Sequence, residues 1–386
     1  MTSARFVHPN RFNFWTTTKR TLKTATPGIS TRFSIMFCDS IGLISLKRLI
    51  SNIPPTDSNA APSSSNSYYT CRFMQILNSL VPIFSVILLG VILRRRNFLT
   101  HETTQAFNRF AYFVALPVFL FHKIGTAPTG DGLANRYMIT LLGATLATVC
   151  LSWIVIQIGK INRNARGTFI QAGFRGNLAF IGLPLVIFTT HDLPATQQLK
   201  LESAVLIALP PVVIFYNVAS VTVLSIYSTS TKQLKSWRKV LFNISTNPLL
   251  IACLTGLIVQ RTGFEIPTAF GRTCEVIGAS AFSIALVGIG SQLASISVAG
   301  KWSELLTSSI IKNAACPIAG WTIGRCIGLS GTELQVILIM CATPTAVSSF
   351  ILADQIGGDA NQAASTVVVG TACSFVTLSA LLMFQF

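Results

Sequence analysis

Long apolar stretches recur from residue 76 to the end of this 386-residue chain, and they limit its fold more than any other feature. A helix needs about 20 apolar residues to cross a bilayer. Ten stretches approach that length: about 76–93, 104–124, 136–159, 168–189, 202–226, 240–260, 271–294, 304–327, 333–355 and 362–384. Only 11% of the residues are charged, against about 25% in soluble domains. The sequence therefore predicts an all-α polytopic membrane protein with ten transmembrane helices.

The first 73 residues differ from the rest of the chain. They are basic, rich in Ser, Thr and Asn, and contain no stretch long enough to span a membrane. A transit-like targeting segment, a disordered tail and an upstream start codon chosen in place of Met74 all fit this composition. We expect a disordered or mis-annotated extension over 1–73 and a membrane transporter domain over 74–386.

The net charge of +17 is unevenly distributed. In a soluble protein it would favour nucleic acid as a partner. Here the basic residues gather in the tail and in alternate loops, which is how membrane orientation is encoded. These loops contain Arg94, Arg95 and Arg96, then Lys160, Arg163 and Arg166, then Lys232, Lys235, Arg238 and Lys239. We predict no nucleic-acid partner, and a multi-pass protein of the cell (inner) membrane with both termini of the ten-span unit outside.

An internal repeat relates the two halves of the membrane domain. VPIFSVILLG at 81–90 resembles NPLLIACLTG at 247–256, with Pro and Gly equally spaced. A shift of 166 residues carries Pro82, Gly90 and Phe98 onto Pro248, Gly256 and Phe264. The same shift relates repeat 1, about 76–226, to repeat 2, about 240–384. Because five spans is an odd number, the second repeat is inverted, which is typical of secondary transporters.

The fourth and ninth stretches contain helix breakers at mid-membrane depth. Residues 174–188 read FRGNLAFIGLPLVIF, and we predict a break at Gly182-Leu183-Pro184. In the ninth stretch we predict a break at Thr343-Pro344-Thr345. Broken helices in lipid are tolerated where they line a cavity or are buried in protein. Two crossing breaks would aim positive half-helix ends at the midplane and form an anion site, although simple kinks are the alternative.

Eight residues around the two breaks are the candidate substrate-binding set: Asn177, Gly182, Pro184, Thr343, Pro344, Thr345, Ser348 and Lys312. The amide of Asn177 can donate to a carboxylate or cap freed backbone. The hydroxyl groups after the second break can bind substrate or bond back to the preceding turn. Lys312 lies deep in the eighth stretch, where it could neutralise an anion, carry a coupling proton, or extend to the interface if the helix begins later.

Several segments are similar to the auxin efflux carrier family: FNRFAYFVALPVFLF (107–121), FRGNLAFIGLPLV (174–186), NPLLIACLTGLIV (247–259), KNAACPIAG (312–320) and the region from Cys341 to Leu378. The resemblance covers about 75–386 and assigns no role to Arg175. It implies the fold of bacterial sodium/proton antiporters and bile-acid symporters. Spans 1, 2, 6 and 7 would form a scaffold and a homodimer interface, and the others a domain that moves as an elevator.

The short segment after the fifth span resembles the microbial permease branch rather than the plant exporters. We expect a secondary active carrier of small organic anions, such as dicarboxylates or auxin-like carboxylates. A cation/proton antiporter or a sodium-coupled symporter on the same fold is the main alternative, but the breaks lack midplane carboxylates. A receptor, a channel or an intramembrane enzyme is the other class. The chain has no GxxxxGK[ST], HExxH or GxSxG motif, so we predict no enzyme activity, cofactor or metal.

Overall fold

The computed structural model describes residues 65–128, 132–228, 242 and 245–384, with side chains from Asn78 onward. Every regular element in these ranges is a helix. Helices occur at all ten predicted places. The elements are α3 (Ser65–Arg95), α4 (His101–Phe110), η1 (Ala111–Ala115), α5 (Leu116–Gly125), α6 (Leu133–Ile158), α7 (Arg163–Phe174), η2 (Leu178–Gly182), α8 (Leu183–Thr190), α9 (Ala195–Tyr227), α11 (Pro248–Thr262), α12 (Thr268–Ser295), α13 (Trp302–Ile310), η3 (Ile311–Ala315), α14 (Cys316–Cys326), α15 (Gly331–Cys341), α16 (Ser348–Ile356) and α17 (Ala360–Met383).

Five of these helices are long and apolar enough to cross a membrane. The qualifying segments are Asn78–Arg95, Leu133–Ile158, Ala195–Tyr227, Thr268–Ser295 and Ala360–Met383. Shorter apolar helices cover Leu178–Thr190, Pro248–Thr262 and Gly331–Cys341. The prediction of an all-helical, multi-pass membrane protein is therefore confirmed. The predicted extension lies outside the described residues, apart from its last part, which belongs to α3.

Three π-helical turns occur in the described chain, and each ends just before a proline. In the π turns η1, η2 and η3, the residue after the turn donates its N–H to the carbonyl five residues earlier. Pro117, Pro184 and Pro317 then occupy the second position of α5, α8 and α14. Proline lacks an N–H and clashes with the carbonyl four residues earlier in an α-helix. The wider π turn accommodates the proline while the helix continues.

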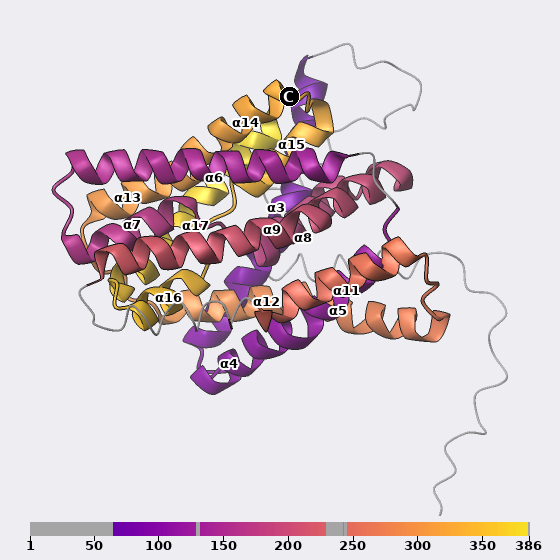
Figure 1. Ribbon diagram of the computed structural model, residues 1–386, viewed down its shortest axis with the longest axis horizontal. Helices are drawn as coiled ribbons and strands as arrows, with labels where there is room; N and C mark the ends of the chain where they lie inside the picture. The colour runs from indigo at the N-terminus through magenta and orange to yellow at the C-terminus, as the bar shows by residue number, and fades with distance from the viewer. Residues whose placement is uncertain (1–64, 129–131, 229–241, 243–244, 385–386) are drawn as a thin grey trace, which may run out of the picture. The chain divides into compact units, whose positions relative to one another are not determined.

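The helices pack as two groups within the unit that begins at Ser64. In the first group α3 packs against α12 and α5 packs against α11. The second group contains α6 to α9 and α13 to α17, with α6 against α14 and α7 against α9. Figure 1 shows α4, α5, α11 and α12 together on one side, with α6, α7, α9 and α13 on the other. The first group thus contains the helices at the positions predicted for spans 1, 2, 6 and 7.

Glycine allows the closest helix crossings in the first group. A Cβ atom on Gly90 of α3 would lie 2.2 Å from the carbonyl oxygen of Val287 on α12. A Cβ on Gly256 of α11 would lie 2.9 Å from the carbonyl oxygen of Phe121 on α5. Small residues let helix backbones approach closely in membranes. Gly90 and Gly256, which the sequence pattern aligns, thus each allow a close approach between two helices.

The fourth span is interrupted earlier than the sequence predicts. The non-helical residues are Arg175, Gly176 and Asn177, between α7 and η2. The predicted break at Gly182–Pro184 is wrong, because Gly182 has helical φ and ψ of −62° and −52° and α8 follows without interruption. In the ninth span the predicted break is confirmed, since residues 342–347 separate α15 from α16. Pro184 and Pro344 are therefore not equivalent, because Pro184 lies within a helix.

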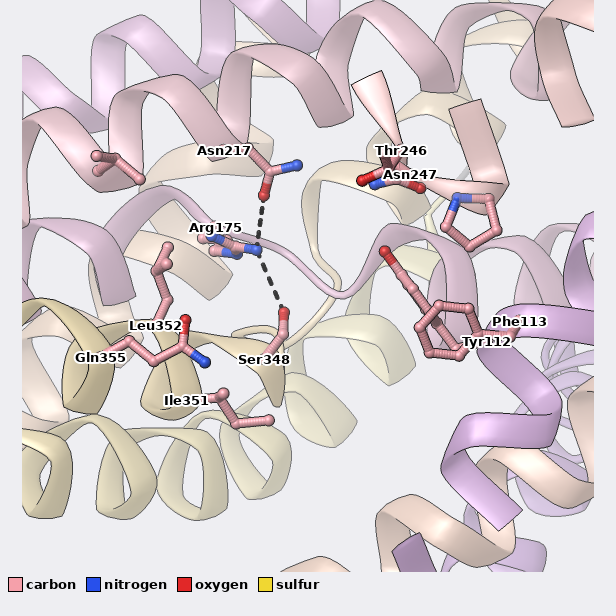
Figure 2. Close-up of a pocket in the computed structure, with 12 residues that line it drawn as sticks. Tyr112, Phe113, Arg175, Asn217, Thr246, Asn247, Ser348, Ile351, Leu352 and Gln355 are labelled. Atoms are coloured by element: carbon pink, nitrogen blue, oxygen red, sulfur yellow. Dashed lines mark hydrogen bonds between the residues drawn. The ribbon is translucent and has the colours of Figure 1, made fainter. Parts of the chain in front are cut away.

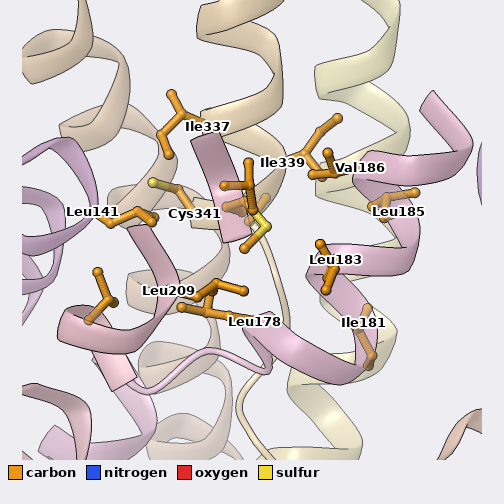
Figure 3. Packing of buried hydrophobic residues seen from close by; sticks show 14 of the residues in the cluster. Leu141, Leu178, Ile181, Leu183, Leu185, Val186, Leu209, Ile337, Ile339 and Cys341 are labelled. Carbon is orange, nitrogen blue, oxygen red and sulfur yellow. The ribbon is translucent and has the colours of Figure 1, made fainter. Parts of the chain in front are cut away.

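A dry apolar core surrounds the halves of the broken helices formed by α8 and α15. Leu183, Leu185 and Val186 of α8 are completely buried. They pack in one cluster with buried residues of α15, α6 and α9 (Figure 3). Because all of α15 from Leu334 to Cys341 is buried, this side of the crossing is filled by protein. Any cavity must lie on the other side.

Candidate functional site

The two helix breaks pair with each other through an isolated antiparallel β-bridge and two flanking backbone hydrogen bonds. Gly176 and Thr345 form an isolated antiparallel β-bridge. The Asn177 N–H donates to the Pro344 carbonyl at 2.8 Å, and the Ala346 N–H donates to the Arg175 carbonyl at 2.9 Å. Helix breaks leave backbone groups without partners, which is costly in a membrane interior. Here each break supplies hydrogen-bond partners for some of the backbone groups of the other.

Two threonine hydroxyls complete the backbone pairing at the crossing. Thr343 Oγ1 donates to the Met340 carbonyl at 2.9 Å, in the last turn of α15. Thr345 Oγ1 donates to the Ala172 carbonyl at 3.0 Å, in the last turn of α7. Both threonines are almost completely buried. Their hydroxyls satisfy carbonyls at the C-terminal ends of the two broken helices.

Lys312 belongs to the same buried arrangement. Its side chain is 0% exposed, and Nζ donates to the Cys341 carbonyl at 2.5 Å, at the C-terminal end of α15. A cation is favourable there because the helix dipole places negative charge at that end. Its complete burial rules out the alternative that Lys312 extends to the membrane interface. It lines neither of the two cavities at the crossing.

Two glycines let the broken helices come close at the crossing. A Cβ on Gly176 would lie 2.6 Å from Thr343 Oγ1 and 2.9 Å from Lys312 Cε. A Cβ on Gly182 would lie 2.8 Å from Thr343 Cγ2. All three distances are too short for an ordinary contact. Gly182 thus brings its helix against the other break rather than against a cavity.

A cavity of about 580 Å³ lies on the side of the crossing where Arg175 projects. We call it the Arg175 cavity. The first helix group contributes Tyr112, Phe113, Thr246, Asn247 and Pro248 to its lining, and the second contributes Arg175, Asn217, Val221, Ser348, Ile351, Leu352 and Gln355. Figure 2 shows the guanidinium of Arg175 between Asn217 and Ser348. The cavity thus lies between the two helix groups.

Among the described residues, the hydrogen-bond partners of Arg175 are neutral. Its Nη2 donates to Asn217 Oδ1 at 2.9 Å and to Ser348 Oγ at 3.3 Å. Its Nη1 is buried and has no hydrogen-bond partner among the described residues. The cavity lining contains no Asp or Glu, and the ion pairs of the described chain do not include Arg175. A buried guanidinium without a counter-charge, beside a cavity, is suited to bind a carboxylate in a forked geometry.

A second, smaller cavity of about 290 Å³ adjoins the first. We call it the Asn177 cavity. The two share Tyr112, Phe113, Ser348 and Ile351 as lining residues. The remaining lining is largely apolar, with Asn177, Asn108, Arg109 and Gln292 as its other polar members, and Phe180, Ala285, Ile289, Ala346 and Val347 as its apolar ones. The pair of cavities can hold a ligand with a charged end at Arg175 and a less polar body.

Comparison with known proteins identifies the family of the chain. A model of the membrane transport protein family matches residues 75–382. The chain belongs to this family. A Rhizobium meliloti protein named as a malonate transporter is 22% identical over 80% of this chain and 95% of its own length. The Escherichia coli transporter YfdV is 23% identical over 72% of this chain and 88% of its own length.

Plant proteins match a shorter part of this transporter. Auxin efflux carrier component 8 of Arabidopsis thaliana is 24% identical over 32% of this chain and 34% of its own length. The resemblance to auxin efflux carriers is therefore confirmed. The family and these relatives are membrane transporters rather than enzymes.

The structure places the eight predicted site residues in three positions in this transporter. Asn177 and Ser348 line cavities. Five others form the crossing itself: Gly182, Thr343, Pro344, Thr345 and Lys312. Pro184 is buried inside the fourth span, in the second position of α8. Arg175 was not among the predicted residues, although a cation inside an apolar stretch was a visible signal.

Within the described chain, no group of three or more His, Cys, Asp or Glu side chains could hold a metal ion. The polar side chains that line the cavities are those of Arg175 and Arg109, amides and hydroxyls. Such groups bind a substrate by charge and hydrogen bonds. They supply neither a nucleophile with an adjacent base nor a set of hard metal ligands.

Proposed function

We propose that this transporter is a secondary active carrier of small organic anions, with the carboxylate of the substrate bound by Arg175. The observation that carries the proposal is the guanidinium of Arg175, which lies beside a cavity with neutral partners only. An unpaired buried charge is expensive, so a site that keeps one is typical of ligand binding. Asn177 and Ser348 would add hydrogen bonds to the bound anion.

The names of the relatives support an organic anion as the substrate. One relative is named for malonate and others for auxin. Both molecules carry carboxylate groups, and they differ in the rest of the structure. A site with one strong cation and an adjoining apolar cavity suits the carboxylate that they share. Malonate, malate and indole-3-acetate are therefore suitable probes.

We also propose ten spans in two inverted repeats, with elevator-type movement of the second helix group against the first. The packing supports the repeats, because spans 1 and 7 pair as do spans 6 and 2, with Gly90 and Gly256 at equivalent crossings. The antiparallel pairing of the broken spans supports it too. Movement between groups would alter the cavity, since both groups line it. The scaffold helices would also form a homodimer interface.

The proposed orientation places the Arg175 cavity in the cytoplasmic half of the cell (inner) membrane. The loops with Arg94 and with Lys160 are cytoplasmic by the positive-inside rule, and the termini of the ten-span unit are then outside. The cavity residues on η1 and α16, and those just before α11, lie in the halves of their spans nearest the predicted cytoplasmic loops. The described conformation would accept substrate from the cytoplasm.

Uptake into liposomes tests the function. Full-length protein would be reconstituted in liposomes that contain the unlabelled anion, and labelled malonate, malate and indole-3-acetate would be offered under imposed pH and voltage gradients. We expect saturable uptake of at least one anion, which Arg175→Gln abolishes and Asn177→Ala weakens. No uptake of any probe, or saturable uptake that Arg175→Gln leaves unchanged, would contradict the proposed site. Saturable sodium or proton antiport without anion flux would favour the alternative on the same fold.

A further inference from the structure

The charge of Arg175 also bears on how the empty carrier behaves. We propose that this protein is an obligatory anion exchanger, in which the helix group that contains Arg175 crosses between its two positions only while an anion is bound. This inference rests on the proposed function and specifies its mode. A carrier of this kind swaps one anion for another and gives almost no net flux.

Arg175 has no resident counter-charge among the residues that the structure describes. Both partners of Arg175 Nη2, the Asn217 amide and the Ser348 hydroxyl, are neutral. The Nη1 group has no hydrogen-bond partner in the described chain. The nearest other buried cation, Lys312, is positive too and is bound to a backbone carbonyl. The site therefore carries an uncompensated positive charge until an anion binds.

The charge of Arg175 belongs to one helix group and faces the other. Arg175, Asn217 and Ser348 all lie on the second group, so they would move together. Across the cavity, Tyr112, Phe113 and Pro248 belong to the first group. Any sliding of one group past the other therefore carries the guanidinium along the interface between them.

Much of the interface between the two helix groups is apolar. The adjoining Asn177 cavity has Phe113, Phe180 and Ile289 in its lining beside Arg109 and three amides, and the α8 side beyond the crossing is a hydrophobic core. An unpaired arginine at membrane depth is costly, whereas a carboxylate bound in a forked pair cancels its charge. The loaded group can then cross readily, and the empty group crosses slowly.

Vesicles with and without internal anion separate the two modes. Wild-type protein would be reconstituted, and uptake of labelled malonate would be measured into vesicles that contain unlabelled malonate or only buffer. Equal potassium on both sides with valinomycin clamps the voltage, so that charge accumulation cannot limit net uptake. We expect initial uptake into loaded vesicles to be about tenfold faster or more, from the cost of an unpaired arginine in the membrane. The same pair of measurements with indole-3-acetate covers the other class of probe.

The outcomes distinguish this inference from the proposed function. Saturable uptake at similar rates into loaded and empty vesicles would overturn the exchange mechanism and leave the anion carrier intact. Uptake of neither probe under either condition would overturn both. For the monocarboxylate indole-3-acetate, an imposed potential should change net uptake but have little effect on exchange, because one carboxylate paired with Arg175 is neutral and only the empty group would then cross with a net charge.

A substitution at Asn217 tests the charge argument directly. Asn217→Asp replaces the amide that accepts from Arg175 at 2.9 Å with a carboxylate of the same shape. With this internal counter-charge the empty group becomes neutral, so we expect the ratio of exchange to net uptake to fall toward one. Asn217→Ala is the control, because it removes the same acceptor without adding charge and should keep the wild-type ratio. Equal ratios in the two variants would contradict the proposal.

Discussion

Lys312 and Arg175 are both cations buried near the helix crossing, and their surroundings differ. Lys312 Nζ donates to the Cys341 carbonyl at the C-terminal end of α15, and the side chain is 0% exposed. Arg175 is 9% exposed, lines a cavity of about 580 Å³ and is bound by a neutral amide and a neutral hydroxyl. The charge of Lys312 compensates the end of a helix, and the charge of Arg175 remains available to a ligand.

Depth in a span therefore does not by itself identify a binding residue. Both residues are ionisable groups at membrane depth, which makes each a functional candidate from sequence. Their partners separate them, because the partner of Lys312 carries the negative end of a helix dipole. Arg175 has no such partner, so a ligand can supply one.

The largest expected effect is that of Arg175→Gln on transport. Removing one member of a buried, hydrogen-bonded charge pair costs about 2–5 kcal/mol. We therefore expect kcat/KM for anion uptake to fall by about 30-fold or more, with little change in the amount of folded protein. Uptake kinetics at matched protein density in liposomes measure this. A variant with kcat/KM near that of wild type would contradict the assignment of Arg175.

Lys312→Met should affect stability rather than substrate affinity. It leaves the Cys341 carbonyl buried without its donor, which costs about 1–3 kcal/mol in the free energy of unfolding. Thermal unfolding in detergent measures the loss, and KM for uptake should stay close to the wild-type value. Lys301→Met is the control, because Lys301 is exposed and its ion pair with Glu304 is on the surface. A raised KM with unchanged stability would show that Lys312 binds substrate.

The smallest effect is expected from two neighbouring serines. Ser348 Oγ accepts from Arg175 Nη2 and lines both cavities, whereas Ser349 Oγ is buried without a partner. Ser348→Ala removes one hydrogen bond that orients the guanidinium, which should raise KM by about fivefold for a loss of roughly 1 kcal/mol. Ser349→Ala should leave KM unchanged. Equal effects of the two substitutions would remove Ser348 from the site.

The sequence predicts the helices and the second break well, because both depend on local composition. Apolar length marks each span, and Thr343-Pro344-Thr345 is non-helical as expected. The first break was misplaced because Pro184 is accommodated by a π turn that local patterns do not reveal. The true break at Gly176 depends on pairing with Thr345, which is far away in the chain.

The site was predicted in part. Asn177 and Ser348 were identified correctly as residues near the crossing, and both line cavities. Arg175 was missed because its value depends on which partners surround it, and those partners come from α9 and α16. Thr343 and Thr345 have side chains that could bind a ligand, but their hydroxyls are used by the backbone of the crossing. Only the folded arrangement shows which polar groups remain available.

Ligand-induced stabilisation of the purified protein tests whether Arg175 binds the anionic substrate. Thermal unfolding of wild type, Arg175→Gln and Lys312→Met would be followed with and without malonate and indole-3-acetate. A ligand at 100 times its Kd stabilises the folded state by about 2.7 kcal/mol. We predict that one of these anions raises the Tm of wild type and of Lys312→Met, each relative to its own unliganded value, but not that of Arg175→Gln. An equal rise in Tm in Arg175→Gln, or a rise in Tm that is lost only in Lys312→Met, would contradict the assignment of Arg175 as the anion-binding residue.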